Sequence, residues 1–319
     1  MASSVVDCVV IGGGPAGLAA AGALARLNHS CLVFDSGVYR NSKSPHVHGF
    51  LGWDHRDGAD LRIQARADLV ARYPTVQFRD VAAKQLTQQR AGRFQVIDEN
   101  DIELMGRTVI LATGVRDIML DVDGYAECWT KGIFHCLLCH GYEEKGADSV
   151  GVLAIGKAAA PHAALHMACS ATRLALHINI YTNGDESVAA TIGEALGAAL
   201  SGKSTDKISF ETRKITRVRM AERPGGTPSE VVVTLEDGTE KQEGFLLNGP
   251  FPEQLGLNVT TTGEIDTKPP FGETSLPGVY VAGDAMTNVR FVVNAALSGS
   301  SAGAGAAFKI ELEDLQEAN

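Results

Sequence analysis

A glycine-rich turn between an apolar strand and a helix constrains this chain more than any other feature. The apolar run Val5–Ile11 ends in Gly12-Gly13-Gly14-Pro15-Ala16-Gly17, and a helical stretch of small residues follows over Leu18–Ala25. A second apolar run, Cys31–Phe34, ends in Asp35. A strand, a GxGxxG turn, a helix, a strand and an acid about 20 residues further on are typical of a dinucleotide-binding βαβ unit. The sequence therefore predicts such a site near the start of the chain.

Each glycine of the spacing has its own expected role. Gly12 allows the tight turn, Gly14 lets the backbone approach a pyrophosphate, and Gly17 permits close packing of the helix on the strand. The first helical amides then face the phosphates, and Asp35 can accept a hydrogen bond from a ribose hydroxyl.

A second unit of this type is expected in the middle of the chain, where Ser149–Gly156 reads as a strand. The turn after it, Gly156–Pro161, lacks the glycine spacing, and the next strand ends in Tyr181-Thr182-Asn183-Gly184-Asp185 without an arginine for a 2′-phosphate. Residues 151–157 also match the start of a P-loop, but Ala158 lacks the hydroxyl that would hold magnesium. The pattern therefore disfavours both NADPH and ATP.

The segment Cys136-Leu137-Leu138-Cys139-His140 is the candidate reactive site. Two cysteines with this spacing can close a small disulfide, which indicates redox chemistry. A helix N-terminus near Cys139 would lower its pKa, and His140 adds a base that exchanges protons near neutral pH. The alternative is half of a structural zinc site with His135 or His140 as further ligands. The chain has no second CxxC, so we predict a redox pair and no metal.

Composition narrows the possible partners and the location. A length of 319 residues predicts about two domains. The formal net charge of −10 disfavours nucleic acid and anionic membranes as partners. No apolar run approaches the roughly 20 residues that span a bilayer. The N-terminus leads into a strand without the regions of a signal peptide, so a cytoplasmic protein is expected.

Three motifs occur together at a characteristic spacing. They are the GxGxxG turn, Ala112-Thr113-Gly114 after a buried strand, and Gly283-Asp284 at the end of another. In this arrangement the chain resembles the thioredoxin-reductase-like flavoproteins over nearly its whole length. The resemblance implies an α/β fold with two Rossmann-like, three-layer nucleotide-binding domains. Residues 1–116 and 249–319 would form a discontinuous FAD domain, and residues 117–248 an inserted NAD(P)-type domain that carries the CxxC. It also implies a homodimer.

The same resemblance implies which residues contact FAD. Most belong to the three motifs, and the others lie in the loops after the early strands or at the start of the last helix. For His48, in a polar stretch with other histidines, a plain surface position is the alternative. The implied set is Gly12, Gly14, Pro15, Ala16, Gly17, Asp35, Ser36, Arg40, Asn41, His48, Val81, Ala112, Thr113, Gly114, Gly283, Asp284, Asn294 and Ala295.

Departures from the thioredoxin reductase pattern point to a subgroup. Thioredoxin reductases have an acid directly after the CxxC, where this chain has His140. Their glycine-rich NADPH turn and arginine cluster are both missing. Two lost charged hydrogen bonds of about 1.5–3 kcal/mol each weaken NADPH binding by roughly 10²- to 10⁴-fold. The pattern Cys-x-x-Cys-His-Gly-Tyr is similar to the fungal and bacterial dithiol oxidases of the gliotoxin and holomycin type. Those enzymes close a disulfide in a small molecule and pass the electrons through FAD to oxygen, with release of hydrogen peroxide.

The resemblance implies a mechanism for Cys136, Cys139 and His140. A substrate thiolate attacks Cys136 of the oxidised pair, and the second substrate thiolate resolves the mixed disulfide. Cys139 lies against the flavin by analogy. His140 deprotonates the substrate thiols, whose reference pKa near 8.5 leaves only a few per cent thiolate at neutral pH. The alternatives are an NADPH-dependent disulfide reductase and a redox-sensing flavoprotein without turnover.

Overall fold

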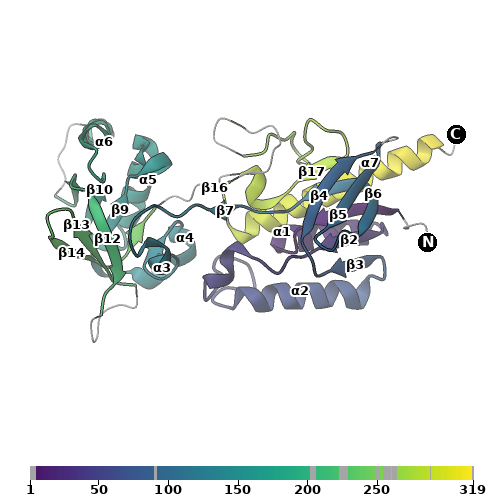
Figure 1. Ribbon diagram of the computed structural model, residues 1–319, viewed down its shortest axis with the longest axis horizontal. Helices are drawn as coiled ribbons and strands as arrows, with labels where there is room; N and C mark the ends of the chain where they lie inside the picture. Colours follow the sequence, from purple (N-terminus) through teal and green to yellow (C-terminus); the bar gives the residue numbers. More distant parts are fainter. Residues whose placement is uncertain are drawn as a thin grey trace. The chain divides into compact units, whose positions relative to one another are not determined.

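The structure is a computed structural model that describes residues 5–89, 92–201, 206–222, 229–248, 252–253, 260, 264–287 and 289–317. The chain divides into two compact units, residues 1–116 with 252–319 and residues 117–251 (Figure 1). The sequence places these boundaries after residues 116 and 248, and residues 249–251 lie outside the described part. The connecting strands β7 (Arg116–Asp117) and β16 (Pro252–Glu253) pair with each other as a two-stranded sheet.

The first unit is built on a seven-stranded sheet in the order β3-β2-β1-β6-β5-β4, with β17 paired to the last part of β6. Strands β3, β2, β1, β6 and β17 are parallel to one another, whereas β4, β5 and β6 form an antiparallel meander. Chain order reverses between β1 and β6, the kind of point at which α/β sheets bind ligands. The strands are β1 (Val6–Ile11), β2 (Cys31–Phe34), β3 (Val76–Arg79), β4 (Ala83–Gln88), β5 (Phe94–Asp98), β6 (Glu103–Leu111) and β17 (Val279–Val281).

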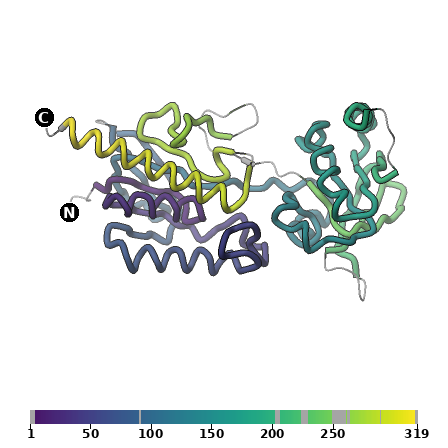
Figure 2. Tube along the Cα trace, turned by 180° about the vertical axis from the view of Figure 1, so that it is seen from behind, coloured from purple at the N-terminus to yellow at the C-terminus, as the bar shows by residue number. Residues whose placement is uncertain are grey.

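Helices α1 (Pro15–Arg26) and α7 (Val292–Glu317) both pack on this sheet, and their backbones approach each other closely. A methyl group placed on Gly299 of α7 would lie 2.1 Å from the Ala16 carbonyl oxygen, so only glycine fits there. Figure 2 shows the two helices side by side, α1 in purple and α7 in yellow. Helix α2 (Gly58–Arg72) begins directly after Asp57, whose side chain caps it by accepting from the amides of Ala59 and Asp60. The short helices η1 (Arg40–Lys43) and η5 (Gly283–Met286) follow β2 and β17.

The second unit has a five-stranded parallel sheet in the order β11-β10-β9-β15-β8 and a three-stranded antiparallel sheet, β12-β13-β14. One face of the parallel sheet packs on α5 and α6, and the other on β12 and β13. The two faces give three layers, in agreement with the predicted α/β class. The strands are β8 (Ile133–Phe134), β9 (Ala147–Leu153), β10 (Ala175–Tyr181), β11 (Ile208–Glu211), β12 (Ile215–Met220), β13 (Val231–Leu235), β14 (Glu240–Glu243) and β15 (Leu246–Leu247).

The helices of the second unit are α3 (Tyr125–Cys128), α4 (Leu137–His140), η3 (Tyr142–Glu144), η4 (Gly156–Ala159), α5 (Pro161–Ala171) and α6 (Glu186–Ala199). Within the described ranges of both units, no helix is long and apolar enough to cross a membrane.

Candidate functional site

The three predicted motifs of the first unit meet at one edge of its sheet. In the parallel register, Ile11 pairs with Phe34 and Leu111, and Leu111 pairs with Val281. Each of the three motifs directly follows a strand that ends at this edge. The glycine-rich turn follows β1, Ala112–Gly114 follows β6, and Gly283–Asp284 follows β17. Segments far apart in the sequence therefore converge at the carboxyl ends of neighbouring parallel strands, where open α/β sheets bind nucleotides.

Two of the glycines have the structural roles that the spacing predicts. Gly12 has a φ of +118°, and a methyl group on it would lie 2.2 Å from the Ala112 carbonyl oxygen. A methyl group on Gly17 would lie 1.8 Å from the Gly12 carbonyl oxygen. Neither position tolerates a side chain, so the turn is tight and α1 starts directly against it.

Gly14 differs from these two because it faces open space. Its φ is −74°, which any residue adopts, and a methyl group on it would meet no described atom within 4 Å. It is the N-cap of α1, no side chain caps the helix, and the first turn contains no acid. The uncapped amides at this helix N-terminus suit a phosphate group. The space in front of Gly14 thus fits the pyrophosphate of FAD.

Asp35 lies buried beside the turn and already has two donors. Its carboxylate accepts from Gly37 N at 3.0 Å and from the Tyr39 hydroxyl at 2.7 Å. Burial, and then the hydrogen bond to Asp35, raises the pKa of Tyr39 to about 12. A methyl group on Gly13 would lie 2.2 Å from the Asp35 carboxyl carbon. Gly13, which the motif leaves unassigned, is therefore the residue that lets Asp35 approach, and a ribose hydroxyl would share the carboxylate with Tyr39.

Arg40 and Asp284, predicted independently, form an ion pair. Arg40 Nη1 donates to Asp284 Oδ2 at 3.0 Å, with both side chains mostly buried. Gly283 has a φ of +75°, and its amide donates to Ser298 Oγ at 2.9 Å. A methyl group on Gly283 would lie 2.9 Å from Cβ of Ala16. The Gly-Asp turn is thereby tied to η1, α1 and α7.

The remaining predicted residues lie around this edge with varied partners. Asn41 Oδ1 accepts from Arg62 Nη1 at 3.0 Å, and the Arg62 guanidinium lies 3.9 Å above the Tyr39 ring. Asn294 Nδ2 donates to the Val289 carbonyl at 2.9 Å. Ser36 and Val81 follow β2 and β3, Thr113 and Gly114 follow β6, and Ala295 lies near Gly283. His48 is in a loop of its own, where its ring packs against His55. Tyr39, Arg62 and Ser298 are the site neighbours that the motif analysis missed.

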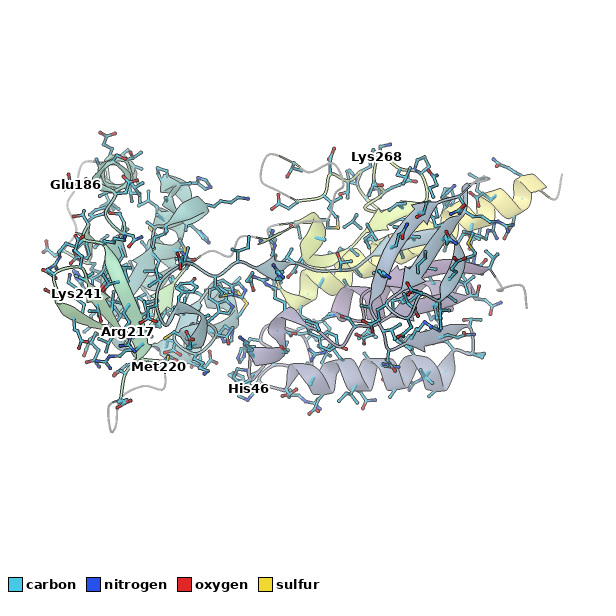
Figure 3. The ribbon with its side chains drawn as sticks, in the orientation of Figure 1. His46, Glu186, Arg217, Met220, Lys241 and Lys268 are labelled. Atoms are coloured by element: carbon cyan, nitrogen blue, oxygen red, sulfur yellow. A yellow bond between two sulfur atoms is a disulfide. The ribbon has the colours of Figure 1, made fainter. Side chains whose placement is uncertain are left out.

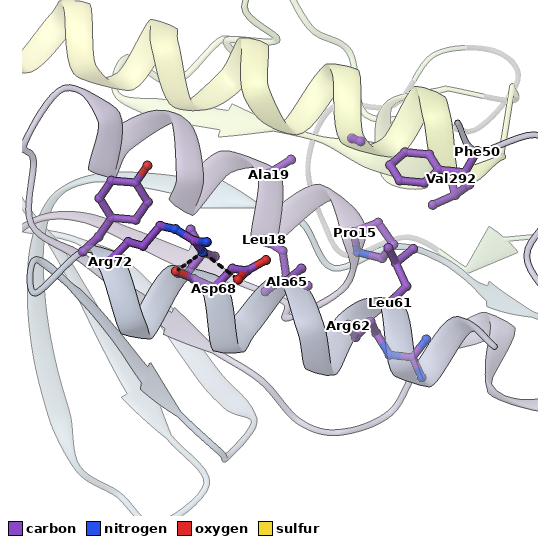
Figure 4. A pocket seen from close by; sticks show the side chains of 13 residues that line it. Pro15, Leu18, Ala19, Phe50, Leu61, Arg62, Ala65, Asp68, Arg72 and Val292 are labelled. Atoms are coloured by element: carbon purple, nitrogen blue, oxygen red, sulfur yellow. Dashed lines mark hydrogen bonds and ion pairs between the residues drawn. The ribbon is translucent and has the colours of Figure 1, made fainter. Parts of the chain in front are cut away.

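A cavity of about 320 Å³ lies between α1, α2 and the start of α7 (Figure 4). Pro15, Leu18, Phe50, Leu61 and Val292 contribute to its mostly apolar wall. Of the predicted flavin set, Pro15 is the member that lines it.

In the second unit, Cys136 and Cys139 form a disulfide with a Cα–Cα distance of 5.3 Å (Figure 3). Cys136 is the N-cap of α4, and Cys139 N donates to the Cys136 carbonyl at 3.2 Å. Both cysteines are partly exposed. A helix therefore starts at the cysteine pair, but α4 is a single turn of four residues.

His140 ends this turn and stacks on a buried ring. Its imidazole lies 4.9 Å from the Phe134 ring centroid at an angle of 18°, and Phe134 packs on Phe245. His135 stacks in the same way on Trp129, at 5.7 Å. Among the described residues, no cluster of three close metal-ligating side chains includes either cysteine. The arrangement fits a redox disulfide with an adjacent base better than half a zinc site.

The nucleotide-type turn of the second unit is filled by protein. Between β9 and α5 the chain forms η4, with Ala158 buried, and α5 starts only at Pro161. A polar crevice at the end of β10 is lined by Asn183, Gly184, Asp185, Glu186, Thr212, Arg213 and Glu236. The sequence predicts no arginine at the end of this strand. An arginine does reach the crevice, because the β11–β12 connection brings Arg213 there.

The charge of Arg213 is neutralised by two carboxylates. Its Nε and Nη2 donate to Glu211 at 2.8 and 2.7 Å, and its Nη1 donates to Asp237 at 2.7 Å. The hydrogen bonds from Arg213 are the main reason why the pKa of Glu211 is lowered to about 2. Lys241 Nζ also lies 2.6 Å from Glu211. The guanidinium fork that would hold a 2′-phosphate is therefore already occupied within the protein.

Comparison with known proteins assigns the family. The sequence model of the pyridine nucleotide-disulphide oxidoreductases matches residues 6–299. The chain belongs to this family. It is 39% identical over 323 residues to thioredoxin reductase aclD of Aspergillus oryzae, covering 98% of this chain and 99% of the relative. It is 40% identical to thioredoxin reductase tcpT of Claviceps purpurea, covering 94% and 93% of the two chains.

Solved structures agree with this assignment. The crystal structure of HlmI matches with a TM-score of 0.83 at 26% identity, covering 98% of this chain and 95% of HlmI. An oxidoreductase from Agrobacterium tumefaciens matches with a TM-score of 0.79 at 27% identity, covering 97% and 99%. This pyridine nucleotide-disulphide oxidoreductase is thus a thioredoxin-reductase-like oxidoreductase of a flavoprotein family, as its motifs predict.

Proposed function

We propose that this protein is an FAD-dependent dithiol oxidase, which closes a disulfide within a small-molecule dithiol and reduces oxygen to hydrogen peroxide. The observation that carries the proposal is that Arg213 is paired with two carboxylates of the protein. A reductase of this fold draws electrons from NADPH, whereas here two carboxylates already hold the guanidinium in the corresponding crevice. A route that starts from substrate thiols needs no such site.

The FAD would lie along the sheet edge of the first unit. The α1 amides at Gly14 would face its pyrophosphate, and Asp35 would accept from a ribose hydroxyl. Asp284, oriented by Arg40, would accept from a further hydroxyl group. When bound, FAD supplies a two-electron acceptor that oxygen can reoxidise.

The disulfide of the second unit would carry out the thiol chemistry. A substrate thiolate attacks Cys136, the Cys136–Cys139 bond breaks, and Cys139 leaves as a thiolate. The second substrate thiolate then attacks the mixed disulfide, which releases the cyclic disulfide product and Cys136 as a thiolate. Two electrons and two protons pass from the substrate to the protein, and the same number goes on to oxygen as hydrogen peroxide. His140, held by its stacking on Phe134, takes the substrate protons.

A second candidate is an NADPH-dependent disulfide reductase. It is favoured by one observation, that the curated relatives aclD and tcpT are both named thioredoxin reductases. We propose a homodimer for either function, with a small-molecule thiol or disulfide as substrate.

An oxygen electrode distinguishes the candidates. We expect the purified protein to consume oxygen with small dithiols alone, and Cys136→Ser, which cannot form the disulfide, to abolish this consumption. NADPH should give no consumption and, without oxygen, should leave the flavin oxidised. Bleaching by micromolar NADPH would replace the oxidase with the reductase. A protein that responds to neither would be a redox-sensing flavoprotein.

A further inference from the structure

A closed loop in the first unit brings together two histidines and an acid, His48, His55 and Asp54. Val47 and Arg56 pair as an antiparallel bridge, with Val47 N donating to the Arg56 carbonyl at 2.8 Å. His48 and His55 follow and precede this bridge, so they face each other across the base of the loop. Their ring centroids lie 4.5 Å apart at an angle of 79°. The arrangement places two imidazoles together on a short, closed segment.

The carboxylate of Asp54 faces both rings. His48 Nδ1 lies 3.7 Å from Asp54 Oδ1, and His55 Nε2 lies 3.7 Å from Asp54 Oδ2. These separations exceed a direct N–H···O hydrogen bond of about 2.7–3.2 Å. Asp54 is itself fixed, since its carboxylate accepts from Gly49 N at 2.8 Å. A fixed carboxylate thus lies beside both rings.

We infer that His48 and His55 bind a divalent first-row transition metal ion such as Zn²⁺, with Asp54 as the carboxylate that positions the two rings. Ligand nitrogens of the two histidines lie within 4.8 Å of each other. Two nitrogens on a tetrahedral zinc, each at about 2.0–2.1 Å, are about 3.4 Å apart. Small rotations of two side chains bridge this difference. Imidazole ligands select zinc, copper or nickel over magnesium and calcium.

The surroundings of the rings suit an ion that is reached from solvent. The His48 side chain is 11% exposed, whereas those of Asp54 and His55 are each 58% exposed. One ligand is thus held in the protein, and the remaining positions of a tetrahedral ion would be filled by water. A carboxylate beside metal-bound histidines fixes their orientation and offsets the charge of the ion.

The backbone at His55 guides the choice of the test variant. His55 has a φ of +58°, in the left-handed region where asparagine, aspartate and histidine are enriched among non-glycine residues. An asparagine at this position therefore removes the imidazole and keeps the turn.

Calorimetric titration of Zn²⁺ into the oxidised, flavin-loaded full chain tests the inference. The exposed pair His162 and His166, one turn apart on α5, is a competing surface site, so all variants carry His162→Gln and His166→Gln. In this background we expect one equivalent of Zn²⁺ to bind, and Mg²⁺ not to bind. His48→Gln and His55→Asn, which preserves the left-handed turn, should each weaken binding more than tenfold.

Two matched variants separate ligation from structure. His46→Gln removes a neighbouring exposed histidine and should leave Zn²⁺ affinity unchanged. Asp54→Asn retains the acceptor for Gly49 N but loses the charge, and should weaken binding by about 10- to 100-fold. Saturating Zn²⁺ should raise Tm by on the order of 5 °C in the background protein, and not in His48→Gln. Equal Zn²⁺ affinity in the background protein and in both ligand variants would overturn the inference, as would equal losses in His46→Gln.

Discussion

The buried carboxyl of Glu243 should make the second unit lose stability as the pH rises. Glu243 lies at the end of β14 and is 1% exposed. Its Oε1 accepts from Asn179 Nδ2 at 2.7 Å and from the Tyr181 hydroxyl, but Oε2 has no hydrogen-bond partner in the part of the chain that the structure describes. Burial is the main cause that raises the pKa of Glu243. The native state therefore favours the protonated side chain.

The sign of the effect follows from proton linkage. A group whose pKa is higher in the folded than in the unfolded state contributes stability that is fully present below its unfolded pKa, about 4.3 for glutamate. This contribution is lost as the pH rises to the folded pKa and beyond, at about 1.4 kcal/mol for each unit between the two values. Glu243→Gln keeps an oxygen for both donors and does not titrate. Relative to wild type, its free energy of unfolding should increase by about 1.4 kcal/mol per pH unit within this window and stay level outside it.

Urea unfolding monitored by tryptophan fluorescence measures this difference. The chain has two tryptophans, Trp53 and Trp129, so a Trp53→Phe background reports the second unit through Trp129. The control is Glu240→Gln, which removes an exposed carboxylate from the same strand and should show no such slope. If the free energy of unfolding of Glu243→Gln differs from that of wild type by the same amount from pH 4 to 9, the assignment of a raised pKa is refuted.

Three further predictions concern the proposed oxidase. Gly14→Leu should fill the space in front of the α1 amides and give colourless protein, and a normal flavin absorbance in that variant would contradict the proposed phosphate site. Cys136→Ser should leave Cys139 as a thiolate with a long-wavelength charge-transfer band, whereas Cys139→Ser should lack the band, and the reverse spectra would exchange the roles of the two cysteines. His140→Ala should slow dithiol oxidation by about 10²- to 10⁴-fold, with a deficit that shrinks towards the pKa of the substrate thiol; a deficit that does not change with pH would assign His140 to packing.

The local parts of the first unit could be predicted because they depend on neighbours in the chain. The role of Gly17 follows from spacing alone, since its close contact, the Gly12 carbonyl oxygen, lies within the turn. The start of α1 is less accurate: the sequence places the helical stretch from Leu18, whereas the helix begins at Pro15, because residues 15–17 of the glycine-rich turn already form its first turn.

Features that depend on residues distant in sequence could not be predicted. Gly13 is needed because Asp35 comes from the next strand, and its motif position carries no signal of that contact. Arg213 reaches the crevice from a different connection than the one in which an arginine is expected, and its pairing with Asp237 joins residues 24 apart in the chain. His48 and His55 come together through the backbone bridge at their base, which the polar composition of the loop does not reveal.

The pairing of β17 with β6 has a consequence for the order in which the protein forms during synthesis. The first unit begins the chain, yet its sheet lacks a parallel strand and its α1 lacks a partner until residues 279–317 have been translated. The second unit is one continuous stretch, residues 117–251, and is complete well before that point. We therefore expect the inserted unit to fold first on the ribosome. The apolar face of the segment with the glycine-rich turn would stay uncovered until the C-terminal helix is made.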